Sequence, residues 1–298
     1  MAVVVLAPAK INLFLQITGD RPDGYHDLKM LMQSVSLADR LTLSLQDTSE
    51  IVIECDHPQV PTDQGNLAYK AVLLLRQRFP ELAQRGVHIA ISKQIPIGGG
   101  LAGGSGNGAA VLSGLNALCQ LGLTNAELAD LALQLGSDVP FCLSGGTAIA
   151  TGRGEQLTPV PNFPALNLVI AKPKDTAVST AWAYQTFRRQ RLIECTSPKV
   201  TELWHRLLAG GNVAAISSSL YNDLERVVLP QYPAIAELKR RLASQGLGAL
   251  MSGSGACVFA ICADADHARN LAQSTVSPHT EAWAVHTLEH GCRVLQLT

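Results

Sequence analysis

The stretch PIGGGLAGGSGNGAA, from Pro96 to Ala110, places seven glycines in fifteen residues and then continues into alanine. Glycine loses more conformational freedom on folding than any other residue, so such a run implies unusual backbone angles or the close approach of a ligand. The segment that follows predicts a helix that begins near Ser105 and ends at Gly122. We therefore expect a glycine loop leading into a helix N-terminus, an arrangement that binds phosphate through backbone N–H groups.

Three other interpretations of the glycine loop are possible. Gly98 to Gly103 matches the G-x-G-x-x-G pattern of dinucleotide-binding proteins, but the acid expected about twenty residues later is Glu127, which also fits a helix cap. A P-loop requires a lysine after its last glycine, and none follows Gly104. A turn that merely lets the helix pack closely remains an alternative.

The composition of the whole chain limits the classes of protein it can be. Its 298 residues are enough for two domains with separate cores. The 23 basic and 24 acidic side chains give a net charge of −1, which disfavours a nucleic-acid partner. No apolar run reaches the roughly 18 residues of a membrane span. The seven cysteines include no C-x-x-C pair, as expected of reduced thiols in the cytoplasm.

The order of predicted elements indicates an α+β fold. Hydrophobic alternation predicts strands at 3–6, 11–15, 41–45, 51–55 and 87–91. Asn66 is a candidate N-cap for a helix, and Thr124 with Glu127 forms the capping-box pattern of another. After the proline-bearing segment 161–166, strands and helices are mixed without a repeating β-α-β pattern. We therefore predict domains at 1–160 and 161–298.

Two charged residues outside the loop fit phosphoryl transfer. Lys10 lies in the apolar segment APAKINLFL, where an amine is costly to bury unless it is paired, although an edge-strand lysine could reach solvent. Asp138, in GSDVPF, fits a turn or an N-cap when taken alone. Beside a phosphate site, the carboxylate would orient or deprotonate an alcohol, and the ammonium would stabilise charge on the reacting oxygens.

A third motif, RPDGYH at 21–26, has the chemistry of a tight turn. It presents Tyr25 and His26 directly after that turn, where a ring and an imidazole suit stacking on a planar base and hydrogen bonding to its edge. A hairpin with a packed tyrosine is the alternative.

Taken together and in order, the motifs resemble the GHMP kinase superfamily over nearly the whole chain: PAKINLFL, RPDGYH, PIGGGLAGGSGNGAA, SDVPF, NDLE and MSGSGACVF. The resemblance implies a ribosomal-protein-S5-like N-terminal domain and a ferredoxin-like C-terminal domain. RPDGYH directly after KINLFL resembles one branch of this superfamily more closely, the kinase branch of the non-mevalonate isoprenoid pathway. That branch implies transfer of the γ-phosphoryl group of ATP to the 2-hydroxyl of 4-diphosphocytidyl-2-C-methyl-D-erythritol.

The resemblance also implies roles for individual residues. Asp138 matches the catalytic aspartate, Lys10 its partner, and Asn12 a substrate-contacting position. Tyr25 and His26 match a cytidine-binding pair, with Tyr184, or alternatively Phe187, on the opposite face of the base. The implied ATP-binding positions, the first two near the adenine, are Asn66, Lys93, Pro96, Gly98, Gly99, Gly100, Leu101, Ala102, Gly103, Gly104, Ser105, Gly106 and Asn107.

The loop departs from the family pattern G-G-G-S-S-[DN]-A-A at two glycines. Gly106 replaces the second serine, and Gly108 is additional. We expect Gly106→Ser to return a hydroxyl to the phosphates and tighten ATP binding. The sequence has no strong metal-ligand cluster, so magnesium is expected to be held mainly by the nucleotide phosphates, with Ser105 as the protein contact.

Three further functions remain as alternatives. They are another GHMP kinase acting on a small amino alcohol, a non-catalytic nucleotide sensor on the same fold, and an RNA-binding protein, which the neutral charge disfavours. The partners expected from the main interpretation are ATP and the cytidyl substrate, without nucleic acid or membrane. We expect a cytoplasmic monomer or weak homodimer.

Overall fold

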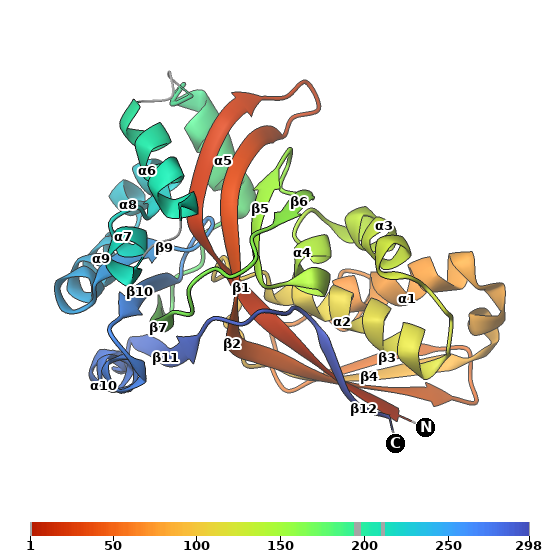
Figure 1. Cartoon of the computed structure of the whole chain (residues 1–298). Helices are drawn as coiled ribbons and strands as arrows, with labels where there is room; N and C mark the ends of the chain where they lie inside the picture. Colours follow the sequence, from red (N-terminus) through yellow and green to blue (C-terminus); the bar gives the residue numbers. More distant parts are fainter. Residues whose placement is uncertain (1, 194–197, 210–211, 298) are drawn as a thin grey trace.

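The computed structural model describes residues 2–193, 198–209 and 212–297, whose strands form two sheets (Figure 1). The first sheet has the order β12-β1-β2-β4-β3. In addition, β5 pairs with β2 and with β6, and β8 pairs with β1. Its strands are β1 (Ala2–Asp20), β2 (His26–Gln46), β3 (Ile51–Cys55), β4 (Gly86–Ser92), β5 (Thr147–Thr151), β6 (Gln156–Pro159), β8 (Tyr221–Asn222) and β12 (Arg293–Leu297). The second sheet, in the order β11-β7-β10-β9, consists of β7 (Asn167–Pro173), β9 (Gly248–Met251), β10 (Val258–Cys262) and β11 (Thr280–His286).

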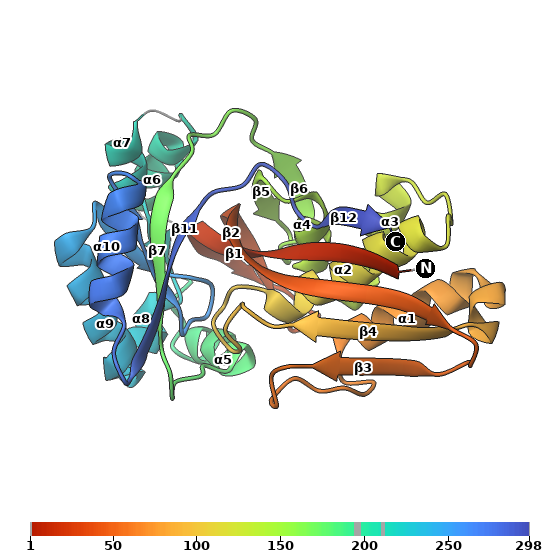
Figure 2. The ribbon, with the colours of Figure 1, turned by 90° about the horizontal axis from the view of Figure 1, so that it is seen from below.

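Helices pack against both sheets (Figure 2). The first half contains α1 (Leu67–Arg78), the short 3-10 helix η1 (Pro80–Gln84), α2 (Gly103–Leu118), α3 (Asn125–Leu135) and α4 (Val139–Ser144). The second half contains α5 (Thr180–Arg189), α6 (Pro198–Leu208), α7 (Val213–Ser217), α8 (Glu225–Gln231), α9 (Pro233–Gln245) and α10 (Ala265–Thr275). This mixture confirms the predicted α+β class.

One long hairpin, β1 with β2, connects the two halves of the molecule (Figure 1). Near its base, Val3 and Val5 belong to the core under α2, whereas Leu15 and Ile17 near its tip pack with residues of the second half. The strands predicted at 3–6 and 11–15 are therefore parts of a single 19-residue strand. Its register with β2 shifts after Pro8, which explains how proline is accommodated inside the strand.

The predicted caps of two helices are confirmed. Asn66 Oδ1 accepts a hydrogen bond from Ala68 N at 2.9 Å at the start of α1. At the start of α3, Thr124 and Glu127 form the reciprocal bonds of a capping box. Both signals depend on residues two or three positions apart, so they can be recognised in the sequence.

Helix α2 differs from its prediction at both ends. It begins at Gly103, with no side-chain cap, after Ala102 in the left-handed conformation at φ 58°. It ends at Leu118 instead of continuing to Gly122, because Gln120 already takes a left-handed conformation at φ 52°. The helix N-terminus therefore lies further inside the glycine loop than the sequence indicated.

The last strand returns to the first sheet, where β12 pairs with β1. β8 also pairs with β1, so the first sheet receives strands from beyond residue 160. The division into 1–160 and 161–298 stays a prediction. Among the residues described, no helix is long and apolar enough to cross a membrane.

Candidate active site

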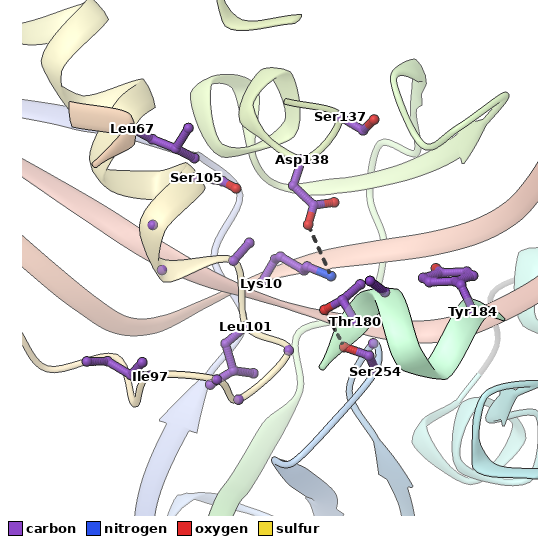
Figure 3. A pocket seen from close by; sticks show the side chains of 18 of the residues that line it. Lys10, Leu67, Ile97, Leu101, Ser105, Ser137, Asp138, Thr180, Tyr184 and Ser254 are labelled. Carbon is purple, nitrogen blue, oxygen red and sulfur yellow. Dashed lines mark hydrogen bonds and ion pairs between the residues drawn. The ribbon is translucent and has the colours of Figure 1, made fainter. Parts of the chain in front are cut away.

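A cavity of about 790 Å³ opens between the glycine loop, β1, the N-terminus of α4 and helix α5 (Figure 3). This volume is in the range of pockets that bind small molecules and cofactors. Every predicted site residue lines it except Gly106 and the alternative Phe187. Phe187 is fully buried in the hydrophobic core, so the suggestion that it stacks on a ligand is wrong.

Lys10 lies at the centre of the cavity, on β1. Its backbone N–H donates to Leu101 O at 3.1 Å, which ties the strand to the glycine loop. Its Nζ donates to Asn12 Oδ1 at 2.7 Å and lies 3.8 Å from Asp138 Oδ2. Lys10 is only 6% exposed, so it does not reach out to bulk solvent as an edge-strand lysine would. A buried, paired ammonium of this kind has a fixed position.

Asp138 occupies the N-cap position of α4, but its side chain makes no capping hydrogen bond. The carboxylate points toward Lys10 and the cavity, and it is 37% exposed (Figure 3). A capping aspartate would direct its oxygens at its own helix instead. The carboxylate is therefore available to a ligand hydroxyl.

The glycine loop has backbone conformations that a side chain would strain. Gly98 and Gly100 have φ of +65° and +72°, and a Cβ at Gly100 would lie 2.2 Å from Ser252 O. That oxygen belongs to the second glycine turn, 251–255, which is joined to the loop by Ser252 Oγ donating to Gly100 O at 3.1 Å. The second turn therefore packs against the glycine loop and supports it at Gly100.

Asn222 fixes the second glycine turn in place. Its Nδ2 donates to Met251 O and to Gly253 O, both at 2.8 Å, and the side chain is buried. Glu225 Oε1 accepts from Met251 N at 2.9 Å. Asn222 and Glu225 are the first and last residues of the NDLE motif, for which the sequence resemblance implied no role.

Asp39 supports the glycine loop, and the sequence did not indicate this role. Its carboxylate is 0% exposed and accepts from Lys93 Nζ at 2.7 Å and from Asn107 Nδ2 at 2.9 Å. Gln94 N and Ile95 N also donate to it, both at 2.8 Å. Asp39 thus joins the segment before the glycine loop to helix α2 after it, and so fixes both ends of the loop.

The two residues predicted near the adenine have polar groups that are already engaged. Lys93 Nζ donates to Ile95 O as well as to Asp39. Asn66 Nδ2 donates to Pro61 O at 2.7 Å, and its Oδ1 caps α1. Both residues line the cavity, where these bonds hold the backbone around it.

Gly106 does not face the cavity. A Cβ there would lie 3.6 Å from Ala7 Cβ, on the side of α2 that packs on β1, and the glycine is at an ordinary helical φ. The expectation that Gly106→Ser places a hydroxyl near the phosphates is therefore wrong. Gly108 is also a packing position, since its Cβ would lie 3.3 Å from Leu67 Cβ of α1.

An aromatic group lines the far end of the cavity. The His26 and Tyr184 rings stack with their centroids 5.4 Å apart, so Tyr184 packs on His26. Tyr25 is 54% exposed, and the Arg153 guanidinium lies 5.0 Å from its ring centroid. Burial lowers the pKa of His26, with a further contribution from the Arg188 charge, whereas burial and the Asp138 charge raise the pKa of Tyr184.

Comparisons with known proteins identify the family of the chain. The model for the GHMP kinases N terminal domain matches residues 66–146, and that for the GHMP kinases C terminal matches residues 204–275. A 4-diphosphocytidyl-2-C-methyl-D-erythritol kinase of Gloeothece citriformis is 50% identical over 285 residues, which cover 91% of this chain and 90% of that protein. The chain belongs to this family of GHMP kinases.

Two further similarities support membership of the GHMP kinases. A 4-diphosphocytidyl-2-C-methyl-D-erythritol kinase of Gloeobacter violaceus is 51% identical over 288 residues, covering 96% of this chain and 94% of that protein. A crystal structure of 4-(cytidine 5'-diphospho)-2C-methyl-D-erythritol kinase superposes with a TM-score of 0.78 at 34% identity, covering 95% and 98% of the two chains. The fold implied by the sequence resemblance is therefore confirmed.

Proposed function

We propose that this GHMP kinase transfers the γ-phosphoryl group of ATP to the 2-hydroxyl of 4-diphosphocytidyl-2-C-methyl-D-erythritol. The products are the 2-phosphate and ADP, in the non-mevalonate route to isoprenoid precursors. The observation that carries the proposal is the order of groups along one cavity. The glycine loop at a helix N-terminus suits a triphosphate, and the Lys10–Asp138 pair suits an alcohol. The aromatic end, lined by Tyr25, His26 and Tyr184, suits a base.

The reacting centre is placed between Lys10 and Asp138. Asp138 accepts a hydrogen bond from the substrate hydroxyl and takes its proton as the oxygen attacks the γ-phosphorus, while the bond from that phosphorus to the bridging oxygen of ADP breaks. Lys10 Nζ, oriented by Asn12, stabilises the negative charge on the oxygens of the transferred group. Since phosphoryl transfer needs little covalent help, positioning and charge stabilisation supply most of the catalysis.

The triphosphate binds along the glycine loop. Backbone N–H groups at the start of α2, from Gly103 to Ser105, provide donors and the positive end of the helix dipole. Gly104 faces open space, where phosphate oxygens can approach the backbone. Magnesium would be held mainly by the phosphates of the nucleotide, with the Ser105 hydroxyl as the protein contact, and it would neutralise charge on the transferred group.

The cytosine binds at the aromatic end. Tyr25 supplies one stacking face, and the buried His26 supplies polar ring atoms for the edge of the base. Tyr184 holds the imidazole by stacking on it and lines the cavity beside it. In the cell, we place this reaction in the cytoplasm, with two small-molecule substrates and no nucleic acid or lipid partner.

A substrate comparison tests the proposal. Purified protein is given ATP and magnesium with either the cytidyl substrate, homoserine or mevalonate, and ADP release is measured by a coupled assay. We expect turnover with the cytidyl substrate alone, and competitive inhibition of that turnover by cytidine diphosphate. Equal or faster turnover with homoserine or mevalonate would assign the chain to another GHMP activity.

A further inference from the structure

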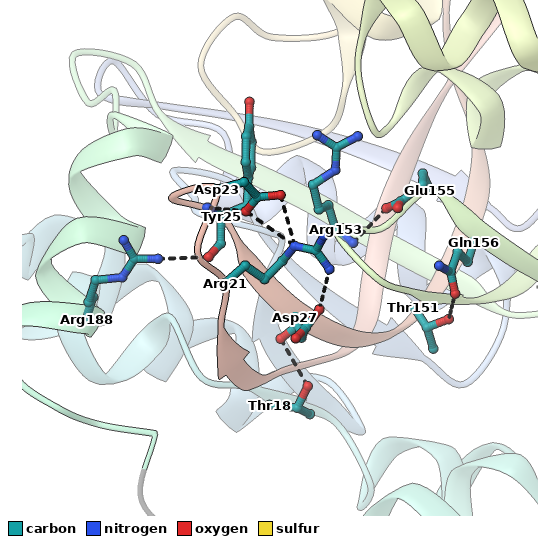
Figure 4. Close-up of polar contacts among 10 residues, drawn as sticks. All are labelled: Thr18, Arg21, Asp23, Tyr25, Asp27, Thr151, Arg153, Glu155, Gln156 and Arg188. Atoms are coloured by element: carbon teal, nitrogen blue, oxygen red, sulfur yellow. Dashed lines mark hydrogen bonds and ion pairs between the residues drawn. The ribbon is translucent and has the colours of Figure 1, made fainter.

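The turn at the tip of the β1–β2 hairpin is held by a side chain from the other half of the molecule (Figure 4). Arg188, near the end of α5, donates from Nη2 to Gly24 O at 3.0 Å and to Tyr25 O at 2.8 Å. Its Nε donates to Asp20 Oδ1 at 2.9 Å. One guanidinium therefore binds both sides of the turn, at the end of β1 and just before β2.

Burial contributes little to fixing this turn. Tyr25 is 54% exposed, and Gly24 has φ +87° with no atom within 4 Å of the place of a Cβ. Within the hairpin, Asp23 Oδ1 accepts from Tyr25 N at 3.1 Å, and Arg21 N donates to Tyr25 O at 3.0 Å. These local bonds shape the turn, but they do not attach it to the rest of the cavity.

Helix α5 also fixes the second residue of the aromatic end. Tyr184 lies one helical turn before Arg188, on the same side of the helix, and stacks on His26. Asp20 lies between these contacts, because the oxygen that accepts from Arg188 is also 2.9 Å from His26 Nδ1. That nitrogen is buried without a partner in hydrogen-bonding geometry. One face of α5 therefore contacts both the Tyr25 backbone and the His26 ring.

We propose that Arg188 is a positioning residue for the nucleoside end of the substrate. Its side chain also lines the cavity, but its role is to hold Gly24 and Tyr25 in place and so preorganise the stacking face, not to bind the substrate itself. This rests on the proposed function, because it assigns Tyr25 to the base. Lysine cannot fully replace Arg188, because the contacts are made by two nitrogens, Nε and Nη2, of one planar guanidinium group.

The first experiment compares three single variants: Arg188→Ala, Arg188→Lys and, as a matched control on the same helix, the exposed Arg189→Ala. For Arg188→Ala, we expect KM for the cytidyl substrate and Kd for cytidine diphosphate to rise about five- to tenfold, the scale of a net hydrogen bond. The kcat at saturation and KM for ATP should stay within twofold. Arg188→Lys should recover part of the loss, and Arg189→Ala should match the wild type.

A double-mutant cycle with Tyr25→Ala separates positioning from direct contact. If Arg188 acts through Tyr25, Arg188→Ala should change KM by less than twofold once the tyrosine ring is absent. The same five- to tenfold loss in both backgrounds would mean that Arg188 binds the substrate itself, and would overturn the proposal. A rise in both KM values with a lower thermal unfolding midpoint would show a general structural role instead, and would also overturn it.

These measurements distinguish a wrong substrate assignment from a wrong role for Arg188. No turnover of the cytidyl substrate by the wild type would refute the proposed function. Normal wild-type turnover with an unchanged KM in Arg188→Ala would refute the positioning role alone.

Discussion

Replacing Asp39 by asparagine should loosen the whole glycine loop. The carboxylate is fully buried and accepts from Lys93, Asn107 and two backbone N–H groups. An amide of the same shape has one acceptor oxygen for these donors, and its NH₂ group faces other donors. Removing one partner of a buried ion pair costs about 3–5 kcal/mol, because the other charge is left uncompensated. We expect a loss of stability of that size, with weaker ATP binding.

Denaturant unfolding followed by circular dichroism, and calorimetric titration of a non-hydrolysable ATP analogue, measure the two effects. The control is the double variant Asp39→Asn with Lys93→Met, which leaves no buried charge at this place. The loss in free energy of unfolding of the double variant should be smaller by at least about 1 kcal/mol than the sum of the losses in the two single variants, as expected for contacting residues. A single Asp39→Asn variant within about 1 kcal/mol of the wild type, or strict additivity, would refute the reasoning.

The remaining predictions concern the reacting centre, the base and the loop. Lys10→Ala should lower kcat about a hundredfold, and a loss below about threefold would make Lys10 structural. Tyr25→Ala should raise KM for the cytidyl substrate about five- to a hundredfold while KM for ATP is unchanged, whereas a rise in both would indicate misfolding. Gly104→Ala should weaken binding of the ATP analogue, because its Cβ enters the open space in which we propose that the phosphates bind. Gly106→Ala, facing Ala7, should leave that binding unchanged and raise stability by about 0.4–1 kcal/mol; equal weakening by both variants would contradict this loop geometry.

The sequence predicted features that depend on neighbouring residues. The caps at Asn66 and Thr124 and the turn before Tyr25 each need only a few adjacent positions. The glycine loop was recognised in the same way, since glycine at positive φ and a following helix are local properties. Residue chemistry paired Lys10 with Asp138, and the resemblance added the order of the motifs; in the structure Lys10 Nζ lies 3.8 Å from Asp138 Oδ2.

The features that the sequence did not predict depend on contacts between distant segments. Asp39 is an unremarkable strand residue until the fold brings Lys93 and Asn107 to it from 54 and 68 positions away. Arg188 reaches Asp20 across 168 positions. The direction of a side chain has the same limit, because Gly106 faces Ala7 instead of the phosphates only as a result of the rotation of α2 on the sheet.

In the proposed reaction, Asp138 is the group that accepts the proton of the substrate hydroxyl. Turnover of Asp138→Asn with saturating ATP and cytidyl substrate, measured beside the calorimetric affinity for each ligand, tests it most directly. We expect loss of turnover by at least about a hundredfold, with both affinities within severalfold of the wild type, because the side chain keeps its shape and loses its basicity. Turnover of Asp138→Asn close to that of the wild type would contradict it.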